Sequence, residues 1–136
     1  MSLRSVAVSS MPNNQLSQHL FVLRGANMAL TTDQTFTKMF TGTNYIITNI
    51  VSVLKTGAFG VACVGGIYIG SGKTGDAVLA ATQSWATLTG AGTSTVANIA
   101  NLLQVKVQTA TPNLSLTTAN TGALTADFFI IGSVVD

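Results

Sequence analysis

The chain has 136 residues, a length that suits one domain with a core of its own. Only 7% of its residues are charged, although the hydrophobic fraction is 47% and the formal net charge is +2. Because the six Lys and Arg residues are scattered, the composition argues against nucleic-acid binding, and the scarcity of charge suggests that self-assembly covers much of the surface.

The first fifteen residues differ from the rest of the chain. They contain Pro12 and too little periodic apolar sequence to fold alone, so we expect residues 1–15 to form an extended arm and residues 16–136 a single domain. The apolar stretch in the arm is too short for a secretory signal. Four apolar side chains of the arm are candidates for docking on a neighbouring protein: Leu3, Val6, Val8 and Met11.

Three runs in the first half of the chain predict strands. HLFVLRG at 19–25 is apolar on both faces, as in a strand that is buried on both sides. YIITNIVSVL at 45–54 is β-branched almost throughout and is long enough for a central strand. GVACVGGIYIG at 60–70 continues after a glycine turn and has the same apolar character.

Two potentially reactive side chains lie in these runs. His19 is the only imidazole, and its position at a strand start favours a partly buried histidine with a hydrogen-bonding role. Cys63 has no partner for a disulfide within the chain, and its apolar neighbours favour a buried, inert thiol. A catalytic dyad of Cys63 and His19 remains open, because proximity cannot be read from the sequence.

The stretch YIGSGKTGDA has the appearance of a nucleotide-binding loop. It contains the pattern G-x-G-x-x-G and the tripeptide Gly-Lys-Thr at 72–74. A P-loop would need a glycine where the chain has Ile67, and a dinucleotide fold would need an acidic residue where the chain has Thr and Ser at 93–95. We therefore interpret residues 70–75 as a turn that binds no nucleotide, with Lys73 at its exposed tip.

Helical signals are few and short. GDAVLAATQSW at 75–85 has room for one or two helical turns, and STVANIANLL at 94–103 has apolar residues at helical spacing behind a capping Ser94 or Thr95. Trp85 is the only tryptophan, and no regular aromatic stripe accompanies it. We interpret Trp85 as a plug of the core or of a subunit contact rather than a stacking platform for a sugar or base.

Three more strands are predicted in the last third of the chain. LLQVKVQT at 102–109 alternates apolar and polar residues, NLSLTT at 113–118 repeats this pattern, and DFFIIGSVV at 127–135 is apolar on both faces. Many short strands separated by Gly and Asn turns predict an all-β fold, a jelly-roll-like antiparallel β-sandwich. Apolar strands without a polar face, together with the low charge, predict an obligate oligomer.

The inventory of reactive groups argues against an enzyme. The chain has no Glu, and its carboxylates are those of four aspartates whose spacing gives no sign that they converge: Asp33, Asp76, Asp127 and Asp136. We therefore predict no catalytic residue, no cofactor and no metal site. The best candidate membrane span, Thr56–Gly72, is rich in glycine and lies between two lysines, and the next uncharged stretch, Ala77–Val105, carries many polar residues, so no membrane association is predicted.

Two stretches resemble small structural proteins of tailed bacteriophages. VGGIYIGSGKTGDAVLAATQSWATLTG at 64–90 resembles a block of these proteins in which a Gly-Gly-Ile-Tyr strand leads through a Lys-Gly turn into a Gln-Ser-aromatic segment. NLSLTTANTGALTADFFIIGSVVD at 113–136 is similar to the ending of the same proteins, and the two stretches cover about half the chain. The resemblance implies a β-sandwich or jelly-roll domain that forms trimers.

The function that this resemblance implies is structural. The chain would be a capsid decoration (cement) protein that stabilises the phage head, assembled in the host cytoplasm and retained in the virion. Its partners would be further copies of itself and the major capsid protein or neighbouring virion proteins. A small tail or baseplate component, a receptor-binding tip and a small membrane-associated protein are the alternatives.

Overall fold

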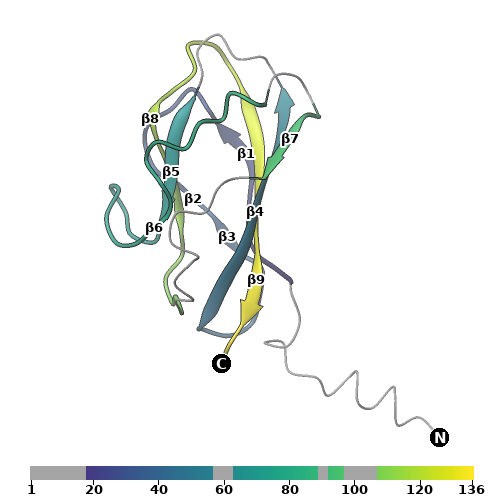
Figure 1. The fold of residues 1–136 in the computed structure, drawn as a ribbon, viewed down its shortest axis with the longest axis vertical. Helices are drawn as coiled ribbons and strands as arrows, with labels where there is room; N and C mark the ends of the chain where they lie inside the picture. Colours follow the sequence, from purple (N-terminus) through teal and green to yellow (C-terminus); the bar gives the residue numbers. More distant parts are fainter. Residues whose placement is uncertain (1–17, 57–62, 89–91, 97–106) are drawn as a thin grey trace, which may run out of the picture.

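The computed structural model describes residues 18–56, 63–88, 92–96 and 107–136. Within these ranges the protein is all-β: its strands form two antiparallel sheets, and no helix is present (Figure 1). The sequence-based expectation of an all-β, sandwich-like fold is confirmed at this level. The jelly-roll topology, the N-terminal arm and the oligomeric state remain predictions.

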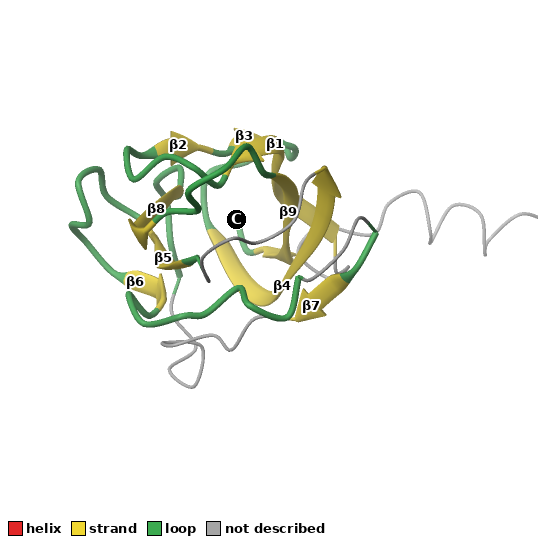
Figure 2. Cartoon of the chain, turned by 90° about the horizontal axis from the view of Figure 1, so that it is seen from above, coloured by secondary structure: helices red, strands yellow, loops and turns green. Residues whose placement is uncertain are grey.

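The larger sheet, which we call sheet A, has five strands in the order β3-β1-β9-β4-β7. Its members are β1 (Gln18–Asn27), β3 (Thr37–Lys38), β4 (Tyr45–Thr56), β7 (Ser94–Val96) and β9 (Thr125–Val134). Sheet B has the order β2-β8-β5-β6 and contains β2 (Gln34–Thr35), β5 (Val64–Tyr68), β6 (Ala77–Leu79) and β8 (Asn113–Thr118). Viewed from above, the two sheets curve around a common interior (Figure 2).

The strands predicted at 19–25, 45–54, 113–118 and 127–135 are confirmed, as is the described part of the one predicted at 60–70, and β4 is an interior strand of sheet A as expected. Along β4, buried side chains alternate with partly exposed ones, which is the period of a strand with one face in the core. The alternation changes phase at Thr48, where the register between β4 and β9 shifts by one residue. Such a bulge turns Ile50 and Leu54 inward, so that they join Tyr45 and Ile47 in the core.

Trp85 lies at the centre of the core and is fully buried. Its ring meets that of Phe128 edge to face at 5.1 Å between centroids. The indole Nε1–H donates to the carbonyl oxygen of Gly65 at 3.1 Å, and the Trp85 amide donates to the carbonyl oxygen of Cys63 at 2.9 Å. The interpretation of Trp85 as a core plug is therefore confirmed. The residue joins the loop after β6 to both sheets.

The prediction of helical turns at 75–85 and 94–103 is wrong wherever the structure describes these residues. Ser94–Val96 form β7, which pairs with Val51–Val53 of β4, and Ala77–Leu79 form β6. Because the free edge of β4 offers backbone hydrogen bonds to β-branched residues, sheet pairing overrides the helical spacing. The rest of that predicted helix, at 97–103, lies outside the described residues.

Two further predictions fall mostly outside the described residues. Of the strand predicted at 102–109, only the end is described: Gln108 pairs with Tyr45 through two backbone hydrogen bonds of 2.8 and 3.0 Å. The arm at 1–15 lies wholly outside, and with it the four candidate docking residues Leu3, Val6, Val8 and Met11.

Candidate functional site

The glycine-rich stretch forms the hairpin turn between β5 and β6, as predicted. The Ile69 amide donates to the carbonyl of Asp76 and the Gly70 amide to the carbonyl of Thr74, each at 3.0 Å. Gly72, Lys73 and Gly75 all have positive φ, between 61° and 72°, and Lys73 is exposed. The glycines thus serve the backbone path of a tight turn.

In this turn, the backbone amide that would bind a phosphate already donates its hydrogen bond to an aspartate. The Gly72 N–H donates to Oδ2 of Asp33 at 2.6 Å, and Oδ1 of Asp33 accepts from the Ser115 hydroxyl at 2.7 Å. The hydrogen bond from Gly72 is the main cause that lowers the pKa of Asp33 below its ordinary value, and that from Ser115 adds to it. An ionised carboxylate at this amide opposes a phosphate in the same place.

We expect Lys73→Ala to change the free energy of unfolding by no more than about 0.5 kcal/mol, because the side chain is exposed at a turn tip. ATP or NAD at millimolar concentration should leave the melting temperature of the wild-type protein unchanged. Differential scanning fluorimetry checks both expectations. A nucleotide-induced rise in melting temperature that disappears in Lys73→Ala would contradict the assignment of residues 70–75 as a turn that binds no nucleotide.

The other carboxylates each hold a different part of the fold. Asp76 accepts from the Gln108 amide side chain at 3.0 Å, and Asp136 accepts from the backbone amides of Thr43 and Asn44 at 2.8 Å. Among the described residues, no three His, Cys, Asp or Glu side chains are placed to hold a metal ion. Each of these described hydrogen bonds of Asp76 and Asp136 fastens a loop or a strand end.

His19 and Cys63 do not form a dyad. Cys63 is fully buried, its Sγ lies 3.5 Å from the carbonyl oxygen of Met28, and burial raises the pKa of its thiol. His19 is exposed rather than partly buried, which corrects the sequence-based expectation. Its ring packs edge to face on Phe129 at 5.8 Å. The bulge that follows His19 in the pairing of β1 with β9 is not visible in the sequence, so its exposure was not predictable.

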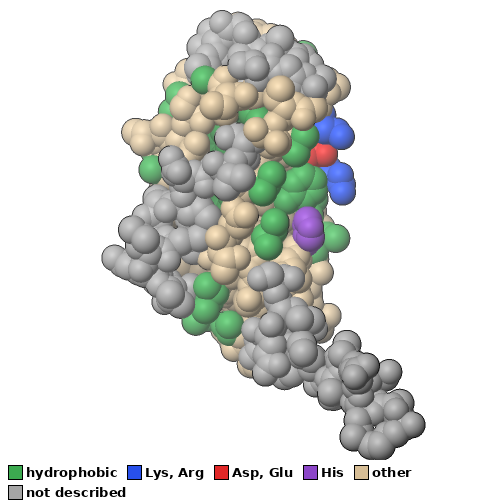
Figure 3. Space-filling view, turned by 45° about the vertical axis from the view of Figure 1, so that its right-hand side comes forward, with side chains coloured by type: hydrophobic (Ala, Val, Ile, Leu, Met, Phe, Trp, Pro, Cys, Tyr) green, Lys and Arg blue, Asp and Glu red, His purple; other side chains and the backbone are tan. Residues whose placement is uncertain are grey.

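The surface of sheet A that points away from sheet B, which we call the outer face, is mainly apolar at its centre. Its side chains alternate with core residues along β1, β9 and β4, and most of them are partly exposed. Figure 3 shows hydrophobic side chains gathered on this side of the molecule. The apolar residues of the outer face are Val22, Ile46, Val51, Val53, Phe129 and Ile131.

One end of the outer face carries a small charged cluster. The carboxylate of Asp127, with only 7% of the side chain exposed, lies 3.5 Å from Nη1 of Arg24 and 3.7 Å from Nζ of Lys55. It also accepts from the Gly25 amide at 2.8 Å. The Arg24 guanidinium lies over the ring of Phe129 at 5.4 Å, so the cluster borders the apolar centre directly.

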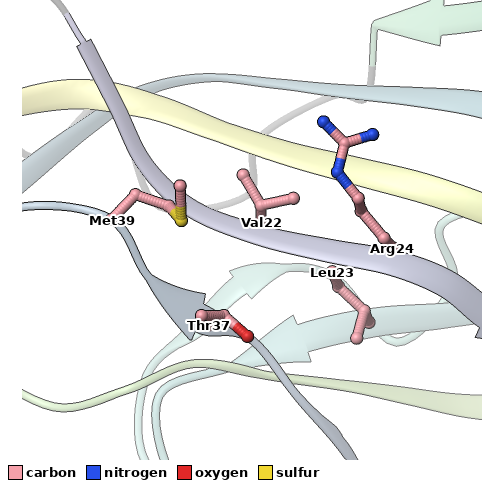
Figure 4. A pocket seen from close by; sticks show the side chains of 5 residues that line it. All are labelled: Val22, Leu23, Arg24, Thr37 and Met39. Carbon is pink, nitrogen blue, oxygen red and sulfur yellow. The ribbon is translucent and has the colours of Figure 1, made fainter.

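A shallow groove of about 320 Å³ crosses the β1–β3 side of the outer face. Figure 4 shows Val22 and Arg24 projecting from one side of β1, Leu23 from the other, and Thr37 and Met39 coming from the neighbouring segment. Met39 is largely exposed. The groove extends the apolar surface toward the sheet edge.

The sequence indicated that these strands have two apolar faces, but it did not indicate the charged cluster of Arg24, Lys55 and Asp127 beside them. Arg24 and Asp127 are separated by 103 positions and meet only because β1 pairs with β9. No helix in the described part of the chain is long and apolar enough to span a membrane. Comparison with family models, with curated proteins and with solved structures finds no match for this chain.

Proposed function

We propose that this chain is a non-enzymatic structural protein of a tailed-phage virion, a capsid decoration protein that associates with copies of itself and with the major capsid protein. The observation that carries the proposal is the outer face. An exposed sheet surface with a mainly apolar centre is typical of a protein that functions by binding other protein surfaces. The sequence resemblance at 64–90 and 113–136 supplies the phage context. A jelly-roll topology and a trimeric unit are part of the proposal.

Decoration would stabilise the head by mass action. A protein that binds only the expanded arrangement of capsid subunits lowers the free energy of that arrangement relative to every other. Because only 7% of residues are charged, the contacts would be apolar packing and hydrogen bonds from backbone, Ser, Thr and Asn. Binding should therefore respond only weakly to salt, since screening acts on exposed charges.

The N-terminal segment is the proposed docking element, which a truncation tests. Deleting residues 1–15 should leave the domain folded and its self-association intact but should abolish attachment to particles. Arg4→Ala is the matched control: it removes the only charged side chain of the segment and, because docking is proposed to be apolar, should keep full occupancy. A variant with serine at Leu3, Val6, Val8 and Met11 should behave like the deletion.

Particle occupancy is measured by co-sedimentation of each purified variant with undecorated heads, followed by electron microscopy. Full decoration by the truncated protein would refute the docking role of residues 1–15. Release of the intact protein by moderate salt would refute apolar docking. Imaging of the source virion locates the protein on the head or on the tail.

A further inference from the structure

The composition of the outer face sets it apart from an ordinary solvated sheet face. In an antiparallel sheet with one face in water, outward positions are typically polar. Here neighbouring positions on the three central strands of sheet A are apolar: Val51 of β4 pairs with Phe129 of β9, which pairs with Val22 of β1. A continuous apolar strip therefore crosses the three long strands of the sheet, β1, β9 and β4.

The charges around the strip restrict what can cover it. Arg24 and Lys55 are its flanking cations at one end, and Asp127 between them neutralises one of the two. Nucleic acid needs a row of cations, and an anionic lipid surface needs a basic border, so neither matches a net charge of +1 at one end. An apolar protein surface does match it.

We infer that the outer face of sheet A is covered by a second copy of this chain. This inference rests on the self-association in the proposed function and names its surface. The three long strands β1, β4 and β9 have 10 to 12 residues each, and β3 and β7 add only two and three residues at the edges. With strands about 4.8 Å apart and roughly 33 Å long, the outer face presents on the order of 500 Å². Covering this face with an equal area of a second copy buries about 1,000 Å² in total, the lower limit for a specific protein interface. The surface of another copy is complementary in kind, because only 7% of its residues are charged, and a contact between unlike surfaces of successive copies is compatible with the proposed trimer.

Light scattering coupled to gel filtration tests the inference with one variant and a matched control. Val51→Glu places a carboxylate in the middle of the strip, where a covering copy would leave it without water, so self-association should weaken at least about 100-fold. Leu30→Glu makes the same change at an apolar side chain that is 44% exposed in the loop between β1 and β2, off the outer face, and should leave the assembly mass unchanged. Near-ultraviolet circular dichroism verifies that both variants keep the fold around Trp85.

A second measurement decides the question should Val51→Glu fail to fold. A nitroxide on Asn49→Cys lies on the outer face beside Ile131, and Cys63 is buried too deeply to take the label. This label should lose accessibility to a water-soluble relaxation agent as the protein associates, whereas a label on Thr82→Cys, at an exposed turn after β6, should not.

Three outcomes would each overturn the inference. They are an unchanged assembly mass for folded Val51→Glu, an unchanged accessibility of the label at position 49, and a wild-type protein that is monomeric at all concentrations. A protein that associates through this face but never binds heads would contradict the decoration function alone.

Discussion

Gly132→Ala should cost about 3 kcal/mol or more of folding free energy, because the added methyl group would meet the main chain of the neighbouring strand β4. Gly132 lies in β9, between Gln18 of β1 and Ile47 of β4. A Cβ at this position would overlap the carbonyl oxygen of Ile46 and would lie 2.8 Å from Cδ1 of Leu20. A carbonyl in the middle of a paired strand cannot move aside by a rotamer change, so β4 and β9 would have to separate.

The matched control for this substitution is Gly122→Ala. The nearest atom to a Cβ at Gly122 is Nδ2 of Asn120 at 3.8 Å, an ordinary contact. Urea denaturation followed by Trp85 fluorescence, at one fixed low protein concentration, compares the two variants with the wild type. Equal midpoints for Gly132→Ala and Gly122→Ala would contradict the close approach of β4 and β9 at this point.

Trp85→Ala should lower the free energy of unfolding by about 3–5 kcal/mol, the usual cost of removing a large buried aromatic side chain. The substitution removes the edge-to-face contact with Phe128 and leaves the carbonyl of Gly65 without the indole donor. Trp85→Phe keeps a ring beside Phe128 but not the donor, so its cost should fall between those of the wild type and alanine.

Because Trp85 is the only tryptophan, thermal unfolding of these variants is followed by circular dichroism. Val107→Ala provides the reference for an apolar side chain at the surface, since Val107 is 48% exposed, and its cost should stay within about 0.5 kcal/mol. A loss for Trp85→Ala no larger than that for Val107→Ala would contradict the placement of Trp85 in the core.

The sequence was informative where local pattern and tertiary structure agree. The β-branched run at Tyr45–Leu54, the short NLSLTT strand and the glycine turn at 70–75 were all predicted, because alternation and turn chemistry are local properties. Trp85 was predicted to fill either the core or a subunit contact, because a large aromatic side chain is most often buried, and the structure places it in the core.

The remaining features depend on pairings between distant segments. The helical spacing after Ser94 gave a wrong prediction because Ser94–Val96 pair with the edge of β4 and form a strand. No local sequence pattern reveals that this edge is available. The contact of Asp33 with Gly72 spans 39 positions and required the three-dimensional arrangement. The phase of the outer face was equally hidden, since the bulge at Thr48 determines which side chains of β4 point outward.

The strand order of sheet A has a consequence for synthesis on the ribosome. β9 comes last along the chain, yet it lies between β1 and β4 and provides the partner edge for both. Until β9 has been translated, β1 and β4 lack the strand that joins them, and their unpaired edges can meet those of other nascent chains. Pairing β1 with β9 also closes a loop of about one hundred residues, so folding should be slow and dominated by late, non-local contacts.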